Sequence, residues 1–228
     1  DYLEIHPENR SKLQKYVKDG RLIIGPWYIQ NDFYLVSGEA TIRNLMIGTK
    51  IANEFGNCSN VGYAADQFGL ISQLPQIYNG YGIDNIVFGR GYDKMFKDET
   101  GTIKKLKTPS EFIWKSPDGS EVLAICMSFW YNNAQRFSED IERSELLLKF
   151  IEESFDGIAT TPYLLLMNGV DHLEAQENLL PIIKRLQEKS FDIRQTTMRE
   201  YVELIKKATC KNDLNIENSE LRYGADLN

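Results

Sequence analysis

The sequence predicts an α/β protein that forms part of an irregular, mainly parallel barrel of the (β/α)7 type. Short apolar segments alternate with amphipathic segments of helical length along most of the 228 residues, and this alternation is typical of βα units. The most apolar segment, residues 163–167, has the composition of a buried central strand. Near residues 108–128 the alternation breaks, which indicates a β-hairpin insertion.

The chain opens with a helix, a strand and a second helix. Apolar residues scattered among charges predict a helix over residues 1–18. Residues 22–29 are rich in β-branched and aromatic side chains, so we expect a strand that bends into a loop at Gly25-Pro26. Apolar residues at helical spacing predict a helix over residues 37–55, with a capping serine at its start and a glycine after its end.

The next segments predict one βα unit, a further strand and the hairpin. We expect a strand over residues 61–65, a helix over 72–81 and a strand over 85–88. Residues 111–115 and 121–127 are then predicted to be two strands joined by the turn Ser-Pro-Asp-Gly. Since a hairpin pairs its strands antiparallel, this segment departs from the parallel pattern.

After the hairpin the alternation of strands and helices resumes. Periodicity predicts helices over residues 138–155, 174–188 and 198–208, and strands over residues 163–167 and 192–196. The residues from Lys211 onward are polar and predict no further element.

Composition and charge exclude several classes of partner. The chain has 26 Lys and Arg against 33 Asp and Glu, a net charge of −7, so we expect no nucleic acid partner, which would need basic surface. No stretch is long and apolar enough for a membrane span, and no signal peptide is evident. Three widely spaced cysteines favour reduced thiols and a cytoplasmic location. The oligomeric state stays open, a homo-oligomer included.

Candidate functional residues follow the ends of the predicted strands, because a parallel α/β barrel builds its active site from the loops at the carboxyl ends of its strands. Asp66, Arg90 and Asp171 hold such positions. Two carboxylates at one rim suit glycoside hydrolysis, which needs a nucleophile or base and an acid. The alternative for each aspartate is a helix cap, and for Asp171 the later Glu174 would complete a capping box. Arg90 could equally pair with an acid at the rim.

The order of motifs along the chain resembles glycoside hydrolase family 38, and most closely the bacterial branch of its α-mannosidases. The resemblance covers nearly the whole chain and rests on the motifs GRLIIGPWY at 20–28, SGE at 37–39 with RNL at 43–45, DQFG at 66–69 with QLPQI at 73–77, RG at 90–91 and NGVDH at 168–172. Each motif alone is weak, whereas all of them in this order are specific.

The resemblance implies a retaining exo-α-mannosidase that uses one zinc ion and acts on mannose-containing oligosaccharides. By position in the family's motifs, Asp66 would be both the nucleophile and a zinc ligand, and Asp171 would be the general acid/base. Arg90 would contact the sugar. Asn132 lies about where the family has an aromatic substrate contact, so this sequence departs from the family pattern there.

The family's other zinc ligands, a His-x-Asp pair and a later histidine, have no counterpart in this sequence. We therefore expect residues 1–228 to be the central part of one N-terminal catalytic α/β-barrel domain, with its start and end and the remaining ligands outside the chain. Two alternatives stay open. One is a metal hydrolase similar to polysaccharide deacetylases, and the other is a catalytically inactive sugar-binding protein of the same fold.

Overall fold

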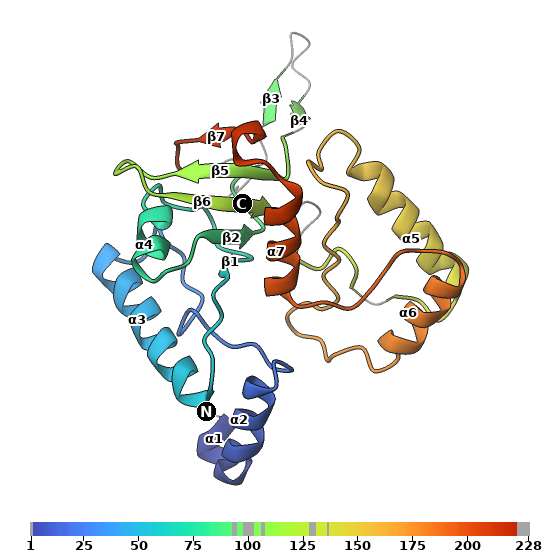
Figure 1. Cartoon of the computed structure of the whole chain (residues 1–228), viewed down its shortest axis with the longest axis horizontal. Helices are drawn as coiled ribbons and strands as arrows, with labels where there is room; N and C mark the ends of the chain where they lie inside the picture. The colour runs from blue at the N-terminus through green and yellow to red at the C-terminus, as the bar shows by residue number, and fades with distance from the viewer. Residues whose placement is uncertain are drawn as a thin grey trace.

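A five-stranded sheet forms the centre of the computed structural model, which describes residues 2–92, 95–97, 103–105, 108–127, 131–135 and 137–222 (Figure 1). The strands lie in the order β1-β2-β6-β5-β7. Their bounds are β1 Gly62–Ala64, β2 Asn85–Phe88, β5 Glu111–Lys115, β6 Glu121–Cys126 and β7 Ile216–Glu217. Within this five-stranded sheet, the β5–β6 pair is antiparallel and the other pairs are parallel. A separate antiparallel pair is formed by β3, Met95–Lys97, and β4, Ile103–Lys105.

Seven α-helices accompany the strands in the described residues. They are α1 Tyr2–Ile5, α2 Arg10–Lys18, α3 Gly38–Phe55, α4 Leu74–Gly80, α5 Ile141–Ser154, α6 Leu179–Glu188 and α7 Met198–Ala208, with short 3-10 turns η1 Pro7–Asn9 and η2 Lys211–Asp213. Local signals fix several ends. Ser37 caps α3 through a hydrogen bond from the Ala40 N–H, and Thr197 with Glu200 forms a reciprocal capping box at α7.

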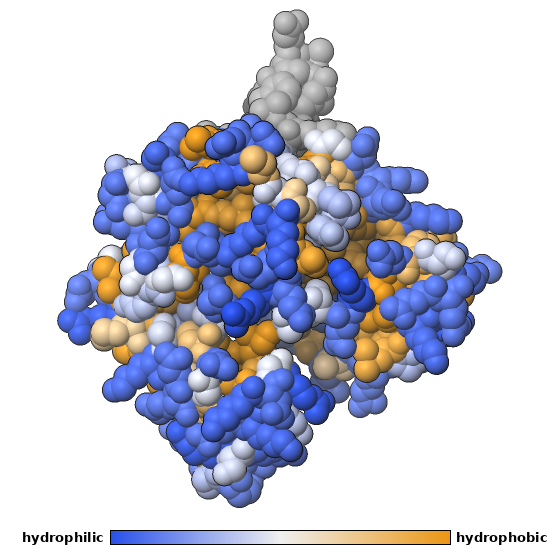
Figure 2. All heavy atoms as spheres, in the orientation of Figure 1, coloured by the Kyte–Doolittle hydropathy of each residue, from blue (hydrophilic) through white to orange (hydrophobic). Residues whose placement is uncertain are grey.

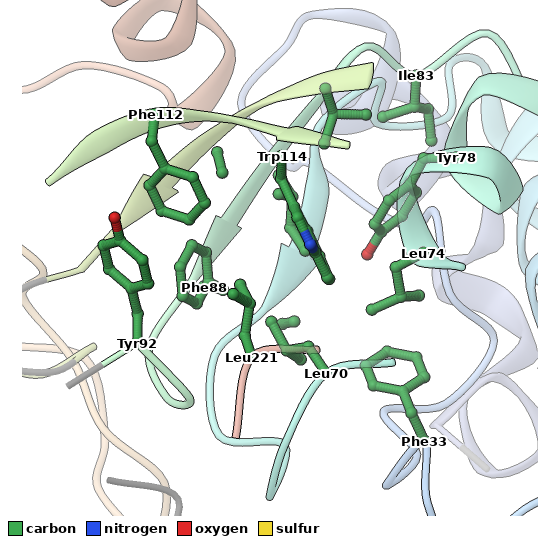
Figure 3. Close-up of a cluster of buried hydrophobic side chains, with 14 of the residues drawn as sticks. Phe33, Leu70, Leu74, Tyr78, Ile83, Phe88, Tyr92, Phe112, Trp114 and Leu221 are labelled. Atoms are coloured by element: carbon green, nitrogen blue, oxygen red, sulfur yellow. The ribbon is translucent and has the colours of Figure 1, made fainter. Parts of the chain in front are cut away.

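The sheet is covered by apolar side chains on both faces. On one face Phe88 and Trp114 pack with Tyr78 of α4, and Tyr92 stacks on Phe112 with ring centroids 4.1 Å apart (Figure 3). On the other face a second cluster joins strand residues to α7, and its buried members are Val61, Val87, Leu123, Ile125, Met127, Tyr201, Val202 and Ile205. The alternation of side chains along each strand sends neighbours such as Val87 and Phe88 to opposite faces.

A third, separate apolar cluster joins α5 and α6, which lie beside each other and away from the sheet in Figure 1. In the view of Figure 2 the surface is mostly hydrophilic, with hydrophobic patches between the polar side chains. Helix α3 has an exposed apolar face as well as a buried one: Leu45 and Ala52 are buried, while Ile42 and Met46 stay exposed.

The predicted α/β class and mainly parallel sheet are confirmed, whereas barrel closure stays a prediction because β1 and β7 are the edges of the sheet in the described residues. The hairpin is also confirmed, but it is not an insertion. Strand β6 pairs in parallel with β2, with Ala124 opposite Ile86, and is therefore part of the central sheet. Its four consecutive buried residues are typical of such a strand.

Three predicted strands are wrong. Residues 22–29 form only an isolated bridge between Ile24 and Cys58, because Gly25 has a φ of +78° and Pro26 offers no N–H to a ladder. Residues 163–167 and 192–196 belong to no strand of the described structure. The first of these two segments lies between two apolar clusters, with Leu165 against the sheet side and Leu166 against the α5–α6 side. Its apolar composition therefore reflects contacts on two sides rather than a central place in the sheet.

Element ends differ from the prediction in three further places. Residues 1–18 divide into α1, η1 and α2 at Pro7, and the helix predicted over residues 174–188 begins only at Leu179. The polar tail does contain a strand, because β7 pairs with β5 through Ile216 opposite Ile113. Two residues of strand within a polar segment carry no periodic signal.

Candidate active site

Asp66 and Arg90 lie side by side at the carboxyl ends of β1 and β2. In the parallel register of these strands Ala64 is opposite Phe88, so the residues two positions beyond each strand end are also neighbours. The Nε and Nη2 atoms of Arg90 lie 2.6 and 2.5 Å from a single oxygen, Oδ1 of Asp66. The Arg90 side chain is 14% exposed and that of Asp66 is 45% exposed, so the pair is partly shielded from water while the carboxylate stays accessible.

Glycines on both sides of Arg90 allow this close approach of the two loops. A Cβ on Gly89 would lie 2.1 Å from the Ala65 carbonyl oxygen, and a Cβ on Gly91 would lie 2.2 Å from that of Leu221. Gly91 also has a φ of +98°, which disfavours other residues. The backbone around Arg90 therefore fits only without these side chains.

The loop after Asp66 is anchored by polar contacts. The Arg90 guanidinium lies over the ring of Phe68, 4.4 Å from its centroid, and the Phe68 N–H donates to Oδ1 of Asp32 at 3.0 Å. Gln67 is buried and donates a hydrogen bond to the side chain of Gln30. These contacts anchor the loop. Asp66 is not a helix cap, because α4 begins eight residues later, at Leu74.

The C-terminal tail also holds this edge of the sheet. Leu221 exchanges both backbone hydrogen bonds with Leu70, at 2.9 and 3.0 Å, and its side chain is buried beside Leu70 (Figure 3). The Trp114 indole N–H donates to the Ser219 carbonyl at 2.9 Å. Since Leu221 also touches the position where a Gly91 Cβ would lie, the tail contacts the loops after both β1 and β2.

The second carboxylate, Asp171, lines a pocket of about 240 Å³ formed with Tyr63, Tyr131 and residues 167–170. The Tyr131 hydroxyl donates to Oδ1 of Asp171 at 3.1 Å, and the other oxygen lies 3.1 Å from Nε2 of His172. The side chain of Asp171 is 61% exposed. Burial, and then the nearby Tyr131, raises the pKa of Tyr63, so this phenol is neutral at ordinary pH.

Tyr63 links the pocket to the first carboxylate. It belongs to β1 and lines the pocket, and Asp66 follows the same strand two residues after its end. In the described part of the chain no hydrogen bond joins Asp66 directly to Asp171. The capping alternative for Asp171 is wrong, because α6 starts at Leu179 and its N-cap position is Asn178.

Comparison with known proteins identifies the family. The model of the glycosyl hydrolases family 38 N-terminal domain matches residues 1–221. The chain belongs to glycoside hydrolase family 38. Among solved structures, an α-mannosidase from Enterococcus faecalis V583 superimposes with a TM-score of 0.87 at 28% identity, over 97% of this chain and 24% of that one. A second Enterococcus faecalis family 38 protein has a TM-score of 0.72 at 24% identity, which supports the fold alone.

Curated relatives are similar over shorter spans. A Halalkalibacterium halodurans protein with the provisional name mannosylglycerate hydrolase is 39% identical over 186 residues, which is 81% of this chain and 21% of that protein. An α-mannosidase of Saccharomyces cerevisiae is 29% identical over 124 residues, or 53% of this chain and 11% of its own length. The chain thus spans about a fifth or less of these relatives.

Asn132, the other residue predicted to bind substrate, contacts only its own loop in the described structure. Its Nδ2 donates to Oε1 of Gln135 at 3.2 Å. The aromatic residue that faces the pocket is its neighbour Tyr131, which residue-by-residue reasoning missed. A signal existed, since family 38 has an aromatic substrate contact at this point of the chain. Tyr63 was missed because it lies within a strand, where an aromatic residue signals only packing.

A family 38 zinc ion would find few ligands here. No group of three His, Cys, Asp or Glu side chains able to hold a metal occurs among the described residues. Asp66 is the one candidate that the motifs supply, and its Oδ1 already accepts from Arg90. The described residues therefore do not form a zinc site by themselves. Within those same residues no helix is long and apolar enough to cross a membrane.

Proposed function

We propose that this chain contributes the two catalytic carboxylates of a retaining exo-α-mannosidase that hydrolyses terminal α-mannosides of oligosaccharides. The observation that carries the proposal is the arrangement along β1. Asp66 at its end is fixed by Arg90, and Tyr63 within it lines the same pocket as Asp171. Such an arrangement supports a role for both acids at one site, since a retaining glycosidase requires two carboxyl groups close together.

In the first step Asp66 attacks the anomeric carbon through Oδ2, since Oδ1 accepts from Arg90, and a covalent mannosyl ester forms. The bond from that carbon to the leaving oxygen breaks, and protonated Asp171 gives its proton to that oxygen. In the second step Asp171 removes a proton from water, the hydroxide attacks the same carbon, and Asp66 is released. Two inversions leave the configuration unchanged.

Arg90 supports this chemistry by holding Asp66 in one orientation, since two N–H groups converge on one oxygen. The proposal includes zinc as the family's metal, with Asp66 as its only ligand from the described residues, and no step above depends on it. It also includes a cytoplasmic location and assigns residues 1–228 to the central part of one N-terminal catalytic domain. The three cysteines form no disulfide in the described structure, as expected in a reducing compartment.

The test uses the full-length protein with p-nitrophenyl α-mannoside and proton NMR of the sugar first released. The expected results are turnover and α-mannose as the initial product. Release of β-mannose would contradict the retaining mechanism, and the absence of turnover on any mannoside together with mannose binding would favour the inactive sugar-binding alternative. Release of acetate from acetylated polysaccharide would favour the deacetylase-like alternative.

Mannosylglycerate is the second substrate to test, because the relative with 39% identity is named as a hydrolase of that compound. A value of kcat/KM that is higher for mannosylglycerate than for mannose disaccharides would assign the natural substrate to a small glycoside. The reverse order would assign oligosaccharides. Both substrates use the same two carboxylates.

A further inference from the structure

The pocket that contains Asp171 is held together by carboxamide side chains rather than by a β-ladder. Nδ2 of Asn133 donates to the Leu165 carbonyl at 2.9 Å, and the Met167 N–H donates to Oδ1 of Asn133 at 2.8 Å. In a parallel sheet one residue, through its own N–H and C=O, bonds in the same way to the carbonyl and the N–H that flank a single residue of the neighbouring strand. The Asn133 carboxamide thus takes the place of a strand residue beside Leu166.

This contact matters because residues 163–167 have no ladder partner among the residues that the structure describes. Two further hydrogen bonds extend the pairing. The Ala134 N–H donates to the Met167 carbonyl at 3.1 Å, and Nδ2 of Asn168 donates to the Ala134 carbonyl at 2.9 Å. Residues 131–135 and the segment leading to Asp171 are therefore fixed to each other chiefly through Asn133 and its neighbour.

Tyr131 and Asp171 lie just beyond the two ends of this pairing. Tyr131 precedes Asn133 by two residues, and Asp171 follows Met167 after Gly169, whose φ is +155°. Because glycine has no Cβ, Gly169 by itself does not restrict the backbone conformation of this segment. The 3.1 Å hydrogen bond from Tyr131 to Asp171 therefore depends on the backbone being held at Met167.

We propose that Asn133 is a positioning residue for the general acid, whose carboxamide fixes the Asp171 segment against the Tyr131 loop. This inference rests on the proposed function. An acid must approach the leaving oxygen to hydrogen-bonding distance to protonate it. Loss of the Asn133 contact should therefore slow the cleavage of bonds that need protonation, and spare those whose leaving group departs without it.

The experiment compares two substrates in the full-length protein. Methyl α-mannoside has a basic leaving group, while 2,4-dinitrophenyl α-mannoside needs no acid to expel its phenolate. For Asn133→Ala we expect kcat/KM to fall at least about tenfold on the methyl glycoside and to stay within about threefold of wild type on the dinitrophenyl glycoside. Asn133→Asp should behave likewise, because it keeps the volume and the acceptor for Met167 but loses the donor to Leu165.

Asn79→Ala is the matched control. Its Nδ2 also donates to a backbone carbonyl, that of Glu121, but at the amino end of β6, opposite the candidate site. This variant should keep wild-type rates on both substrates, and thermal melting of all three variants reports whether they fold. An equal change on both substrates, or none, in folded Asn133→Asp would overturn the inference and leave the proposed function standing. A wild-type protein inactive on both glycosides would overturn the two together.

Discussion

Two nitrogen atoms of Arg90 converge on one carboxylate oxygen of Asp66, at 2.6 and 2.5 Å. Both of these contacts are made by Oδ1 of Asp66 and neither by Oδ2. Of the two roles considered for Arg90, the described structure shows the pairing with an acid at the rim. Contact with a sugar by the same guanidinium remains a prediction.

Replacing Arg90 should therefore impair the nucleophile. We expect Arg90→Met to lower kcat for an aryl α-mannoside by about 10- to 100-fold, since a hydrogen bond to a charged group contributes roughly 1.5–3 kcal/mol. Arg90→Lys should recover only part of this loss, because an ammonium cannot present the same rigid pair of N–H groups. Steady-state kinetics of the three proteins measure the effect. Equal rates for wild type and Arg90→Met would contradict it.

The two carboxylates should differ in their effect on zinc. Asp66→Ala should reduce turnover on the order of a thousandfold or more and also weaken zinc retention, because the proposal gives this carboxylate two roles. Asp171→Asn should reduce turnover of substrates with basic leaving groups but retain zinc. Elemental analysis after dialysis, alongside the rates, separates the two. Wild-type rates in Asp66→Ala would show that the nucleophile assignment is wrong.

Gly48 is a point where α3 touches the chain that leads to the site. A Cβ there would lie 2.3 Å from backbone atoms of Pro26, Trp27 and Tyr28. We expect Gly48→Ala to lower the free energy of unfolding by about 1–2 kcal/mol, because overpacking outweighs the gain in helix propensity. Denaturant titration measures this loss. Gly38→Ala in the same helix, with nothing within 4 Å of its added Cβ, is the control and should cost nothing.

The ion pair between Asp84 and Lys206 connects α7 to the segment before β2, with distances of 2.8 and 2.9 Å. Burial alone would raise the pKa of Asp84, but hydrogen bonds from Lys206 and Asn85 outweigh it and hold this pKa below its ordinary value. The stabilisation is therefore fully present above the unfolded pKa, about 3.9, and is lost as the pH falls through the lower folded pKa.

We accordingly expect Lys206→Met to lower the free energy of unfolding at pH 7 by at most about 1 kcal/mol, since the exposed carboxylate is screened by water. The difference from wild type should shrink toward zero as the pH is lowered below 4, where Asp84 becomes protonated in both states. Urea titrations at pH 7 and below pH 4 test this. A difference that grows in acid would contradict the assignment.

The helices could be predicted because their signals are local. In α7 a threonine cap, Glu200 three residues later and apolar residues on one face all act within the helix itself. The prediction of a strand at residues 163–167 was wrong because a run of apolar residues indicates burial but does not indicate which elements bury it. Here α7 and the sheet lie on one side, and α5 with α6 on the other.

Likewise the site could be predicted only in part. Asp66 and Arg90 were expected at one rim because each follows a strand, and the register of β1 and β2 confirms that they are neighbours. The Tyr131–Asp171 contact and the Asn133 pairing join residues more than thirty positions apart in loops without periodicity. Nothing local marks such contacts, so they had to come from the structure.

The contacts of residues 219–221 with the sheet form late in biosynthesis. Trp114 and Ser219 are 105 positions apart, and Leu221, which pairs with Leu70, lies even later in the chain. As the protein emerges from the ribosome, β1 and Asp66 appear early, but the loop after them pairs with Leu221 only once residue 221 has left the exit tunnel. Translation that stops just short of Ser219 would therefore yield a product that contains Asp66 and Asp171 but lacks the pairing of Leu70 with Leu221.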